Sequence, residues 1–484
     1  MMAMMRGRLS GLRFSQGIPA GLISAVAATY GVGVVALFAS GRAALLQAAL
    51  LLGVPVVLAL GVLRPEWTIL LIVALPPSVI SPIPPLQLVA VMLVTLFGFL
   101  LQGGLRLGPK TGVYPLVGIM ALAFAMRADV PSDATAAADS MLKFITYYTL
   151  LMMVAFHAVA NGRMEIDTFV DALLLGLVGA AILQPFFGGS SAGFEAITHT
   201  PFRGQFSYLA VMGFGVSYVR LSLSRSTDRR QTALDAFLML AFLFLTAISF
   251  GRATWMAGLS IFALVSMWTG RKSFWIVSSL VLVLVLTVPV VGERVLPGGS
   301  ADVTNLETLA RVTTGRSVLW GELWERGADA VPFGRGWGYM WTLRPSDIFG
   351  FEGEFVAGGN PFVYPHNDFL FLFVELGILG LGLLVAFWLR LLRKIRLLSR
   401  SRSEPARYSV RVLIPVVIVM FVVQVFDNGF AIRFVADKFF AAAGLIFGLH
   451  YAVRESERSA AVHSRFVGPS LQSQRKSLQP FDRM

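Results

Sequence analysis

The feature that most constrains this chain is a succession of long apolar runs. Fourteen of them occur, and most approach the 20 or so residues with which a helix crosses a hydrocarbon core. Hydrophobic residues make up 56% of the 484 residues, charged residues only 14%, and the mean hydropathy is +0.73. Soluble domains carry about 25% charged residues. The composition therefore excludes a soluble enzyme, a disordered chain and a nucleic-acid-binding protein, and it predicts an all-α bundle of transmembrane helices.

Twelve to fourteen of these runs are expected to cross the membrane. They lie near residues 20–40, 43–63, 67–80, 85–102, 112–127, 141–160, 168–188, 204–222, 234–250, 253–270, 274–292, 369–390, 410–429 and 433–453. The third run is short and leads into a proline-rich stretch that begins at Pro76, so we expect a broken or re-entrant helix there.

Basic residues indicate how the bundle is oriented. If all fourteen runs cross and the N-terminus is cytoplasmic, loop 390–411 lies inside, with eight basic residues and one acidic residue. About 27 of the 40 Lys and Arg then fall on the cytoplasmic side, as is usual for membrane proteins. We therefore expect a multi-pass protein of the cytoplasmic (inner) membrane with both termini inside. The net charge of +13 then reflects topology and attraction to anionic lipids.

The chain divides into four regions by composition. They are an N-terminal bundle of about eleven spans (1–292), a long outer segment (293–367), three C-terminal spans (368–453) and a basic cytoplasmic tail (454–484) that we expect to be disordered. The outer segment is predicted to form an amphipathic helix over about 306–330, lying at the membrane interface, followed by a Gly-rich turn at Pro332–Gly338. A connection of this length is uncommon unless it is functional.

Ionisable residues gather at the predicted outer face, at the ends of spans and, for Arg316, at the start of the outer-segment helix. Because a charge buried in a membrane costs several kcal/mol, such groups are candidate functional residues. They are Arg203, Arg252, Arg316, His366, Asp427 and Arg433. Arginine binds phosphate through paired hydrogen bonds, and histidine can accept a proton near neutral pH. No acidic pair with metal-ligand spacing occurs there and cysteine is absent, so we expect neither a metal nor another cofactor. The set fits a site for a lipid diphosphate.

Several of these residues lie in motifs that resemble those of the O-antigen ligase and polymerase superfamily. Pro365–Leu370, followed by Glu375–Gly380, is similar to the signature of that family. Arg316 with Trp320 resembles its Arg-x-x-x-Trp element, and Pro332–Gly338 its Pro-x-x-Gly-x-Gly turn. Ser249–Arg252 resembles a Ser-Arg element with Phe-Gly inserted. Arg203–Phe206 resembles the start of an Arg-Gly-x-Phe element, without the Pro-Asn that usually follows it.

The resemblance implies a metal-independent glycosyltransferase that acts on the outer leaflet. Its donor would be an oligosaccharide on a polyprenyl diphosphate, its acceptor a glycan or glycolipid, and its further partners membrane lipids and other polysaccharide-assembly proteins. Arg252 and Arg316 would hold the diphosphate, while His366 would activate the acceptor hydroxyl or bind the diphosphate. The candidate substrate-binding residues are Arg203, Asn367, Glu375 and Asp427. Glu375 is nine residues beyond His366, about 2.5 helical turns, and therefore faces away from it.

Several functions stay open at this point. A polymerase, in O-antigen, capsule or exopolysaccharide assembly, is slightly favoured because the Arg203 element departs from the family pattern. A ligase that transfers the glycan to lipid A core is the alternative. A transporter or flippase of lipid-linked sugars would require helices broken in matching halves, and only the region Pro76–Pro85 offers such a break. A structural scaffold would leave the gathered Arg and His residues unexplained.

Overall fold

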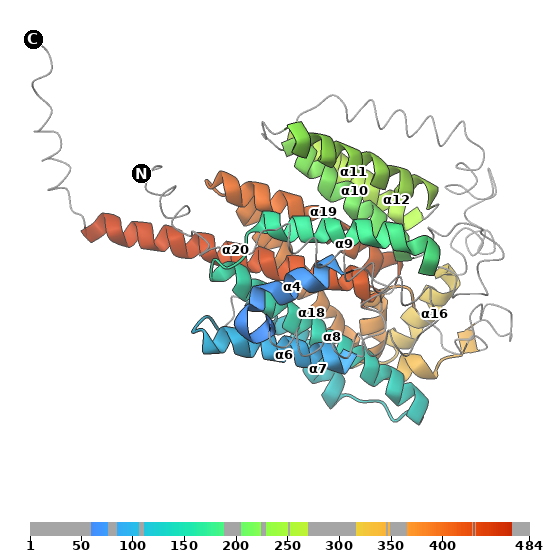
Figure 1. Ribbon diagram of the computed structural model, residues 1–484. Coiled ribbons are helices and arrows are strands. Elements are labelled where there is room, and N and C mark those ends of the chain that lie inside the picture. Colours follow the sequence, from blue (N-terminus) through green and yellow to red (C-terminus); the bar gives the residue numbers. More distant parts are fainter. Residues whose placement is uncertain are drawn as a thin grey trace, which may run out of the picture.

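The computed structural model describes residues 60–75, 85–105, 111–187, 205–223, 229–249, 252–269, 316–344, 347–348, 365–427, 429–430 and 432–466. Every regular element in these ranges is a helix. They are α4 (Pro65–Ala74), α6 (Pro85–Leu101), α7 (Tyr114–Ala125), α8 (Ser132–Ala160), α9 (Ile166–Phe187), α10 (Gln205–Leu223), α11 (Arg229–Ile248), α12 (Arg252–Thr269), α16 (Arg316–Ala328), the 3-10 helix η4 (Tyr339–Thr342), α18 (Asp368–Ser399), α19 (Glu404–Phe426) and α20 (Arg433–Phe466) (Figure 1).

Five of these helices are long and apolar enough to cross a membrane. They are Ser132–Ala160, Phe206–Leu223, Arg229–Ala247, Asp368–Ser399 and Glu404–Phe426. Shorter apolar helices accompany them, so the predicted all-α, multi-pass membrane architecture is confirmed. The runs at 20–40 and 274–292, and nearly all of 43–63, lie outside the described residues. The short third run forms α4, which has only ten residues.

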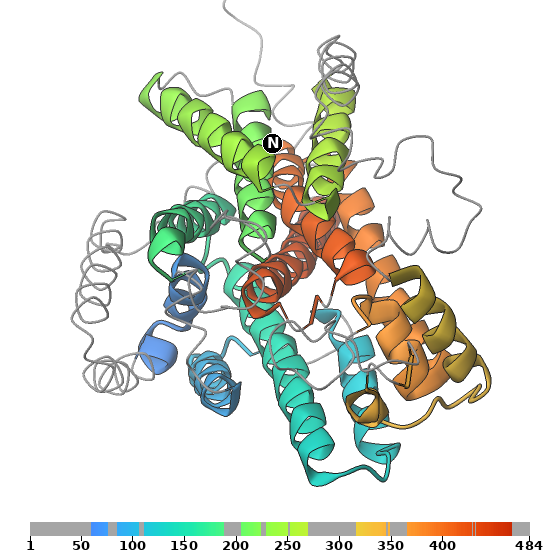
Figure 2. The ribbon, with the colours of Figure 1, turned by 90° about the vertical axis from the view of Figure 1, so that its right-hand side faces the viewer.

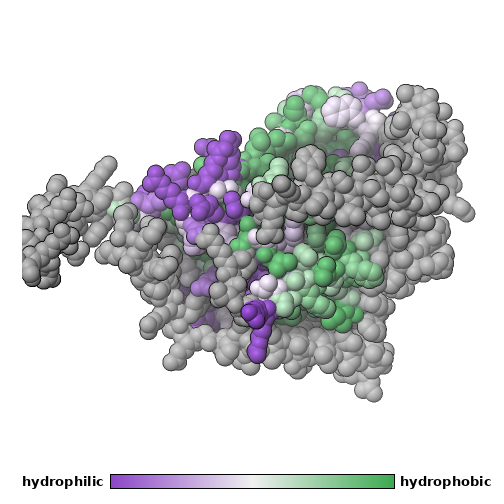
Figure 3. Space-filling model, turned by 90° about the horizontal axis from the view of Figure 1, so that it is seen from above, coloured by the Kyte–Doolittle hydropathy of each residue, from purple (hydrophilic) through white to green (hydrophobic). Residues whose placement is uncertain are grey.

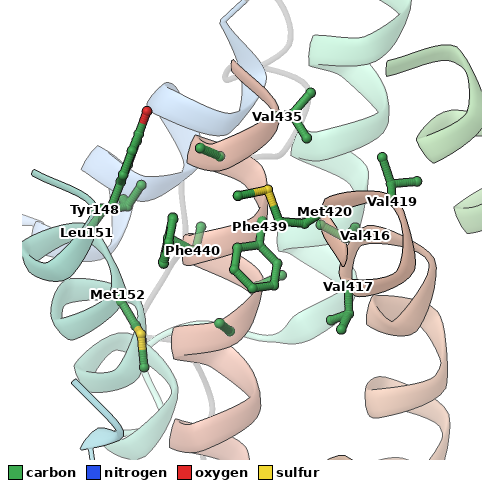
Figure 4. Packing of buried hydrophobic residues seen from close by; sticks show 14 of the residues in the cluster. Tyr148, Leu151, Met152, Val416, Val417, Val419, Met420, Val435, Phe439 and Phe440 are labelled. Atoms are coloured by element: carbon green, nitrogen blue, oxygen red, sulfur yellow. The ribbon is translucent and has the colours of Figure 1, made fainter. Parts of the chain in front are cut away.

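The bundle is built around α20. Seen from the end where α16 lies, α20 (red) runs between α8 (teal) and the orange helices α18 and α19, and the green helices α10–α12 splay to one side (Figure 2). Figure 4 shows Phe440 of α20 beside Tyr148 of α8, and Phe439 toward Met420 of α19. Gly444 lets α20 approach α8 closely, because a Cβ there would overlap the carbonyl oxygen of Met152. The core thus consists of closely packed helices of the C-terminal and N-terminal regions.

α20 extends well beyond the bundle (Figure 1). Its helix continues to Phe466, whereas the predicted span ends at 453 and the tail was expected to be disordered from 454. The difference has a local cause, since Arg, Glu and Ala dominate residues 454–461 and all favour helix.

The flank formed by α11 is apolar and exposed. Leu234, Phe237, Leu240 and Phe244 are each about half exposed or more. Figure 3 shows hydrophobic residues over the side of the bundle and hydrophilic residues toward the end from which α20 projects. An exposed apolar face of this kind suits contact with lipid chains.

The outer segment contains the predicted amphipathic helix in shorter form, as α16. Leu319 and Leu323 are buried, whereas Trp324 is exposed, so one face packs against the bundle. Residues 306–315, including the predicted helix start, lie outside the described part. The position of α16 at a membrane interface stays a prediction.

Candidate active site

The site begins with a histidine and an aspartate from two helix ends. His366 precedes α18, whose first turn is capped by Asn367, the Oδ1 of which accepts a hydrogen bond from Leu370 N at 2.9 Å. Asp427 ends α19. The Nδ1 of His366 lies 3.0 Å from the Oδ1 of Asp427. With Nδ1 donating to this carboxylate, Nε2 is left as the proton acceptor.

The backbone of His366 has φ 48°, in the left-handed region. A non-glycine residue there is disfavoured by about 1–2 kcal/mol. Such strained conformations cluster at functional sites, because the surrounding structure must hold them. The side chains of His366 and Asp427 stay 41% and 23% exposed, so the pair remains accessible.

Tyr208 adds a third group to this pair. It lies in the first turn of α10, is buried, and donates from its hydroxyl to the Oδ2 of Asp427 at 3.3 Å. The chain Tyr208–Asp427–His366 therefore joins three helices. Sequence reasoning missed Tyr208, because a tyrosine within an apolar run has no signal that separates it from a packed core residue.

Arg316, the first residue of α16, lies against the same helix end. Its guanidinium donates to the carbonyl oxygen of Phe426, the residue before Asp427, at 2.5 Å. One turn later, the indole N–H of Trp320 donates to the carbonyl oxygen of Pro365, the residue before His366, at 2.7 Å. The structure thus brings Arg316 together with His366 and Asp427. Among the described residues no carboxylate forms an ion pair with Arg316, and its one described hydrogen bond is to a neutral carbonyl oxygen.

The last outer turn is held by further buried groups. Asp368, at the start of α18, accepts a hydrogen bond from Phe430 N at 3.0 Å, and Tyr148 donates to Phe430 O at 3.0 Å. Arg433 is almost fully buried, with its guanidinium carbon 5.8 Å from the centre of the Phe144 ring. These contacts fix the backbone that carries Asp427.

The remaining predicted site residues are placed differently. Arg203 lies outside the described residues. Arg252 begins α12, and of its side chain nothing is described. Ser207 Oγ and Thr254 Oγ1, 2.6 Å apart, join the start of α12 to the start of α10. The backbone of Arg252 therefore lies at the same end of the bundle as Tyr208.

Glu375 is wholly buried within α18. Its carboxylate accepts hydrogen bonds from Gly338 N and from Met340 N. It lies nine residues beyond His366, about 13 Å along the helix. Its oxygens are engaged by the backbone of the outer segment. Within the described ranges, no three His, Asp or Glu side chains converge in a way that could hold a metal ion.

Part of the chain is similar to a known family. Residues 236–385 match the model of a family described as O-antigen ligase. The matched residues include α12, α16 and the first part of α18, and thus the motifs around Arg252, Arg316 and His366. The resemblance found from these motifs is confirmed. Comparison with curated proteins gave no match.

This similarity supports glycosyltransferase chemistry of the ligase and polymerase type, on a lipid-linked glycan and an acceptor. Tyr208 and Asp427 lie outside the matched residues, although the helices that carry them pack beside these residues.

Proposed function

We propose that this protein transfers an oligosaccharide from a polyprenyl diphosphate to an acceptor hydroxyl, as a polymerase of lipid-linked repeat units. The observation that carries the proposal is the meeting of His366, Asp427 and Arg316. The Arg316 guanidinium, which forms no ion pair among the described residues, lies beside the His–Asp pair. A general base and a fixed cation are the two groups that transfer from a diphosphate requires.

In the proposed step the acceptor oxygen attacks the anomeric carbon of the donor glycan. His366 Nε2 takes the proton of the acceptor hydroxyl, and Asp427 stabilises the imidazolium that forms. The bond from the anomeric carbon to the diphosphate oxygen breaks, and the diphosphate leaves on its lipid. Arg316, together with Arg252 and Arg203, would neutralise the charge that builds up on this leaving group. The reaction balances without an oxidant, a metal or a nucleotide.

The proposed orientation puts the site on the exterior leaflet. His366 precedes the first residue of α18, whereas the basic loop 390–411 begins near the other end of this helix. Basic loops stay in the cytoplasm, so His366 would lie on the opposite side of the inner membrane. The N-terminal bundle and the three C-terminal helices would then enclose the site, and the outer segment would cover it.

Reconstitution of the purified protein tests the proposal. Wild-type protein in lipid nanodiscs is given a polyprenyl-diphosphate oligosaccharide in the presence of a chelator and without ATP, and the lipid extract is analysed by mass. We expect lipid-linked glycans longer by whole repeat units, and none from His366→Ala. Transfer only after lipid A core is added would establish the ligase alternative. Unchanged donor would overturn the glycosyltransferase, and movement of the donor across the bilayer of sealed proteoliposomes would then establish the flippase.

A further inference from the structure

Helix α18 is interrupted where the outer segment meets it. Gly377 has φ 63° and ψ −156°, which breaks the regular helix. The carbonyl oxygens of Val374 and Glu375 accept hydrogen bonds from Arg335 N (2.8 Å) and Gly336 N (2.9 Å) instead of from their own helix. Ile378 N in turn donates to the carbonyl oxygen of Pro332 at 3.1 Å. The Gly-rich turn is therefore joined to α18 by backbone hydrogen bonds on both sides of the break.

Glycine is required at this junction for reasons of space. A Cβ on Gly377 would overlap the carbonyl oxygen of Pro332, and one on Gly334 would overlap the backbone nitrogen of Gly377. The glycines of the turn Pro332–Gly338 thus serve a close approach of two backbones.

The Glu375 carboxylate completes the junction from inside. It is fully buried and accepts from Gly338 N and from Met340 N, the latter at 2.5 Å. An ionised carboxylate offers only acceptors, and both donors here are backbone N–H groups. Trp337, the residue before Gly338, donates from its backbone N to Met126 O at 2.7 Å and from its indole to Ala138 O at 3.1 Å. The turn is thereby fixed to α18 and to the α7–α8 connection at once.

The same turn follows shortly after α16, the helix that carries Arg316. α16 has thirteen residues, about 20 Å, and runs beside α18. At one end Arg316 and Trp320 contact the residues next to Asp427 and His366. In its last turns Trp324 stacks on Phe373 with ring centres 4.9 Å apart, and Arg335 Nε donates to Arg326 O at 3.0 Å. α16 is therefore held against α18 at both ends.

We propose that Glu375 is a positioning residue, which sets the register of α16 along α18 and thereby the place of Arg316 relative to His366. It does this without touching substrate. The inference rests on the proposed transferase function, but the register of α16 along α18 can be measured whether or not the protein is active. Displacement of a charged group by about 1 Å can cost about 100-fold in rate, so an anchor some 13 Å from the imidazole can still control the reaction.

A double-mutant cycle tests the link to Arg316. Glu375→Gln keeps the shape of the side chain but puts an NH₂ donor against a backbone N–H donor. We expect kcat to fall about 100-fold, with the donor KM nearly unchanged. In an Arg316→Ala background the same change should cost less than about two-fold more, because the residue through which Glu375 acts is gone. Glu325→Gln, the same change on the exposed face of α16, is the matched control and should leave kcat unchanged.

If the loss of kcat in the double variant equals the product of the losses in Glu375→Gln and Arg316→Ala, the two residues act independently and the proposal is overturned. The proposal is also overturned if Glu375→Gln lowers the abundance of the protein in the membrane but keeps the wild-type kcat per folded molecule, since Glu375 then has a purely structural role.

A distance measurement decides the matter without activity. The chain has no cysteine, and Gly321 of α16 and Gly382 of α18 both have open space where a Cβ would lie. Spin labels on Gly321→Cys and Gly382→Cys report the register of the two helices. Glu375→Gln should shift or broaden the distance distribution, whereas an unchanged distribution would overturn the positioning role. If wild-type protein shows no transfer at all, the proposed function fails and this measurement alone decides the register.

Discussion

The two ends of α10 use buried polar groups in opposite ways. Near its start, Tyr208 joins the Asp427–His366 pair, beside Arg316. Near its end, Arg220 is buried between two carboxylates, with Nη1 2.6 Å from Asp171 Oδ1 and Nε 3.5 Å from Asp235 Oδ1. The two sites lie on the same helix about 18 Å apart.

The difference lies in the balance of charge. Arg220 faces two acidic groups, so its positive charge is fully compensated within α9, α10 and α11. Arg316 is held by a neutral carbonyl oxygen, and among the described residues no carboxylate neutralises it. A compensated buried charge stabilises the packing of helices. An uncompensated one at an accessible site attracts an anion, and the comparison therefore predicts activity effects at one end and stability effects at the other.

Arg316 offers the largest expected effect. Arg316→Ala should lower kcat by at least about 100-fold, since one lost donor to a developing anion costs about 3–4 kcal/mol in other enzymes. Arg316→Lys should fail nearly as badly, because an ammonium group cannot reproduce the paired geometry of a guanidinium. Turnover of the lipid-linked donor by purified variants, normalised to folded protein, measures both. The exposed Arg344 supplies the control Arg344→Ala, which should keep wild-type rates.

Wild-type turnover by Arg316→Lys would show that any cation suffices at this position. The contrast with Arg220 would then rest on charge alone and not on geometry.

Arg220 should give the next largest effect, but on stability. Arg220→Met leaves Asp235 almost fully buried without its cation, and we expect a loss of about 2 kcal/mol in unfolding free energy. This is less than for a fully buried pair, because Asp171 is exposed and Gln231 still donates to Asp235 at 3.2 Å. Thermal unfolding in detergent measures the loss, and Asp235→Leu in the same background should recover part of it. Abolished transfer at wild-type stability would contradict the distinction between the two ends.

Much of the fold follows from the sequence because membrane helices are specified by length and hydropathy. Eleven of the fourteen apolar runs fall on helices in the described ranges. The break of α18 at Gly377 does not follow, because Leu376–Gly380 reads as a continuous apolar helix. The break is caused by the Gly-rich turn some forty residues earlier, whose backbone N–H groups donate hydrogen bonds to the carbonyl oxygens of Val374 and Glu375.

The site was predictable where a charge is out of place in an apolar sequence. His366 and Asp427 stand near the ends of apolar runs and Arg316 opens the helix of the outer segment, and the structure brings the three together. Glu375 carries the same signal, yet its carboxylate holds the backbone of the Gly-rich turn. A charged residue in an apolar run therefore indicates that its side chain has a partner. The fold is needed to tell whether that partner belongs to the protein or to a ligand. Tyr208 carried no such signal.

Tyr208 should give the smallest effect and sharpens the comparison most. Tyr208→Phe removes a hydroxyl that lies 3.3 Å from Asp427 Oδ2, while the 3.0 Å contact of Asp427 with His366 remains. A hydrogen bond of this kind is worth about 1 kcal/mol, so we expect kcat to fall about five-fold with unchanged thermal stability. Tyr218→Phe, nearly three turns further along α10, is the matched control and should change neither, because Tyr218 acts through ring stacking on Phe214. If Tyr208→Phe instead lowers stability and leaves kcat unchanged, the start of α10 behaves like its Arg220 end, and the orientation of Asp427 does not depend on Tyr208.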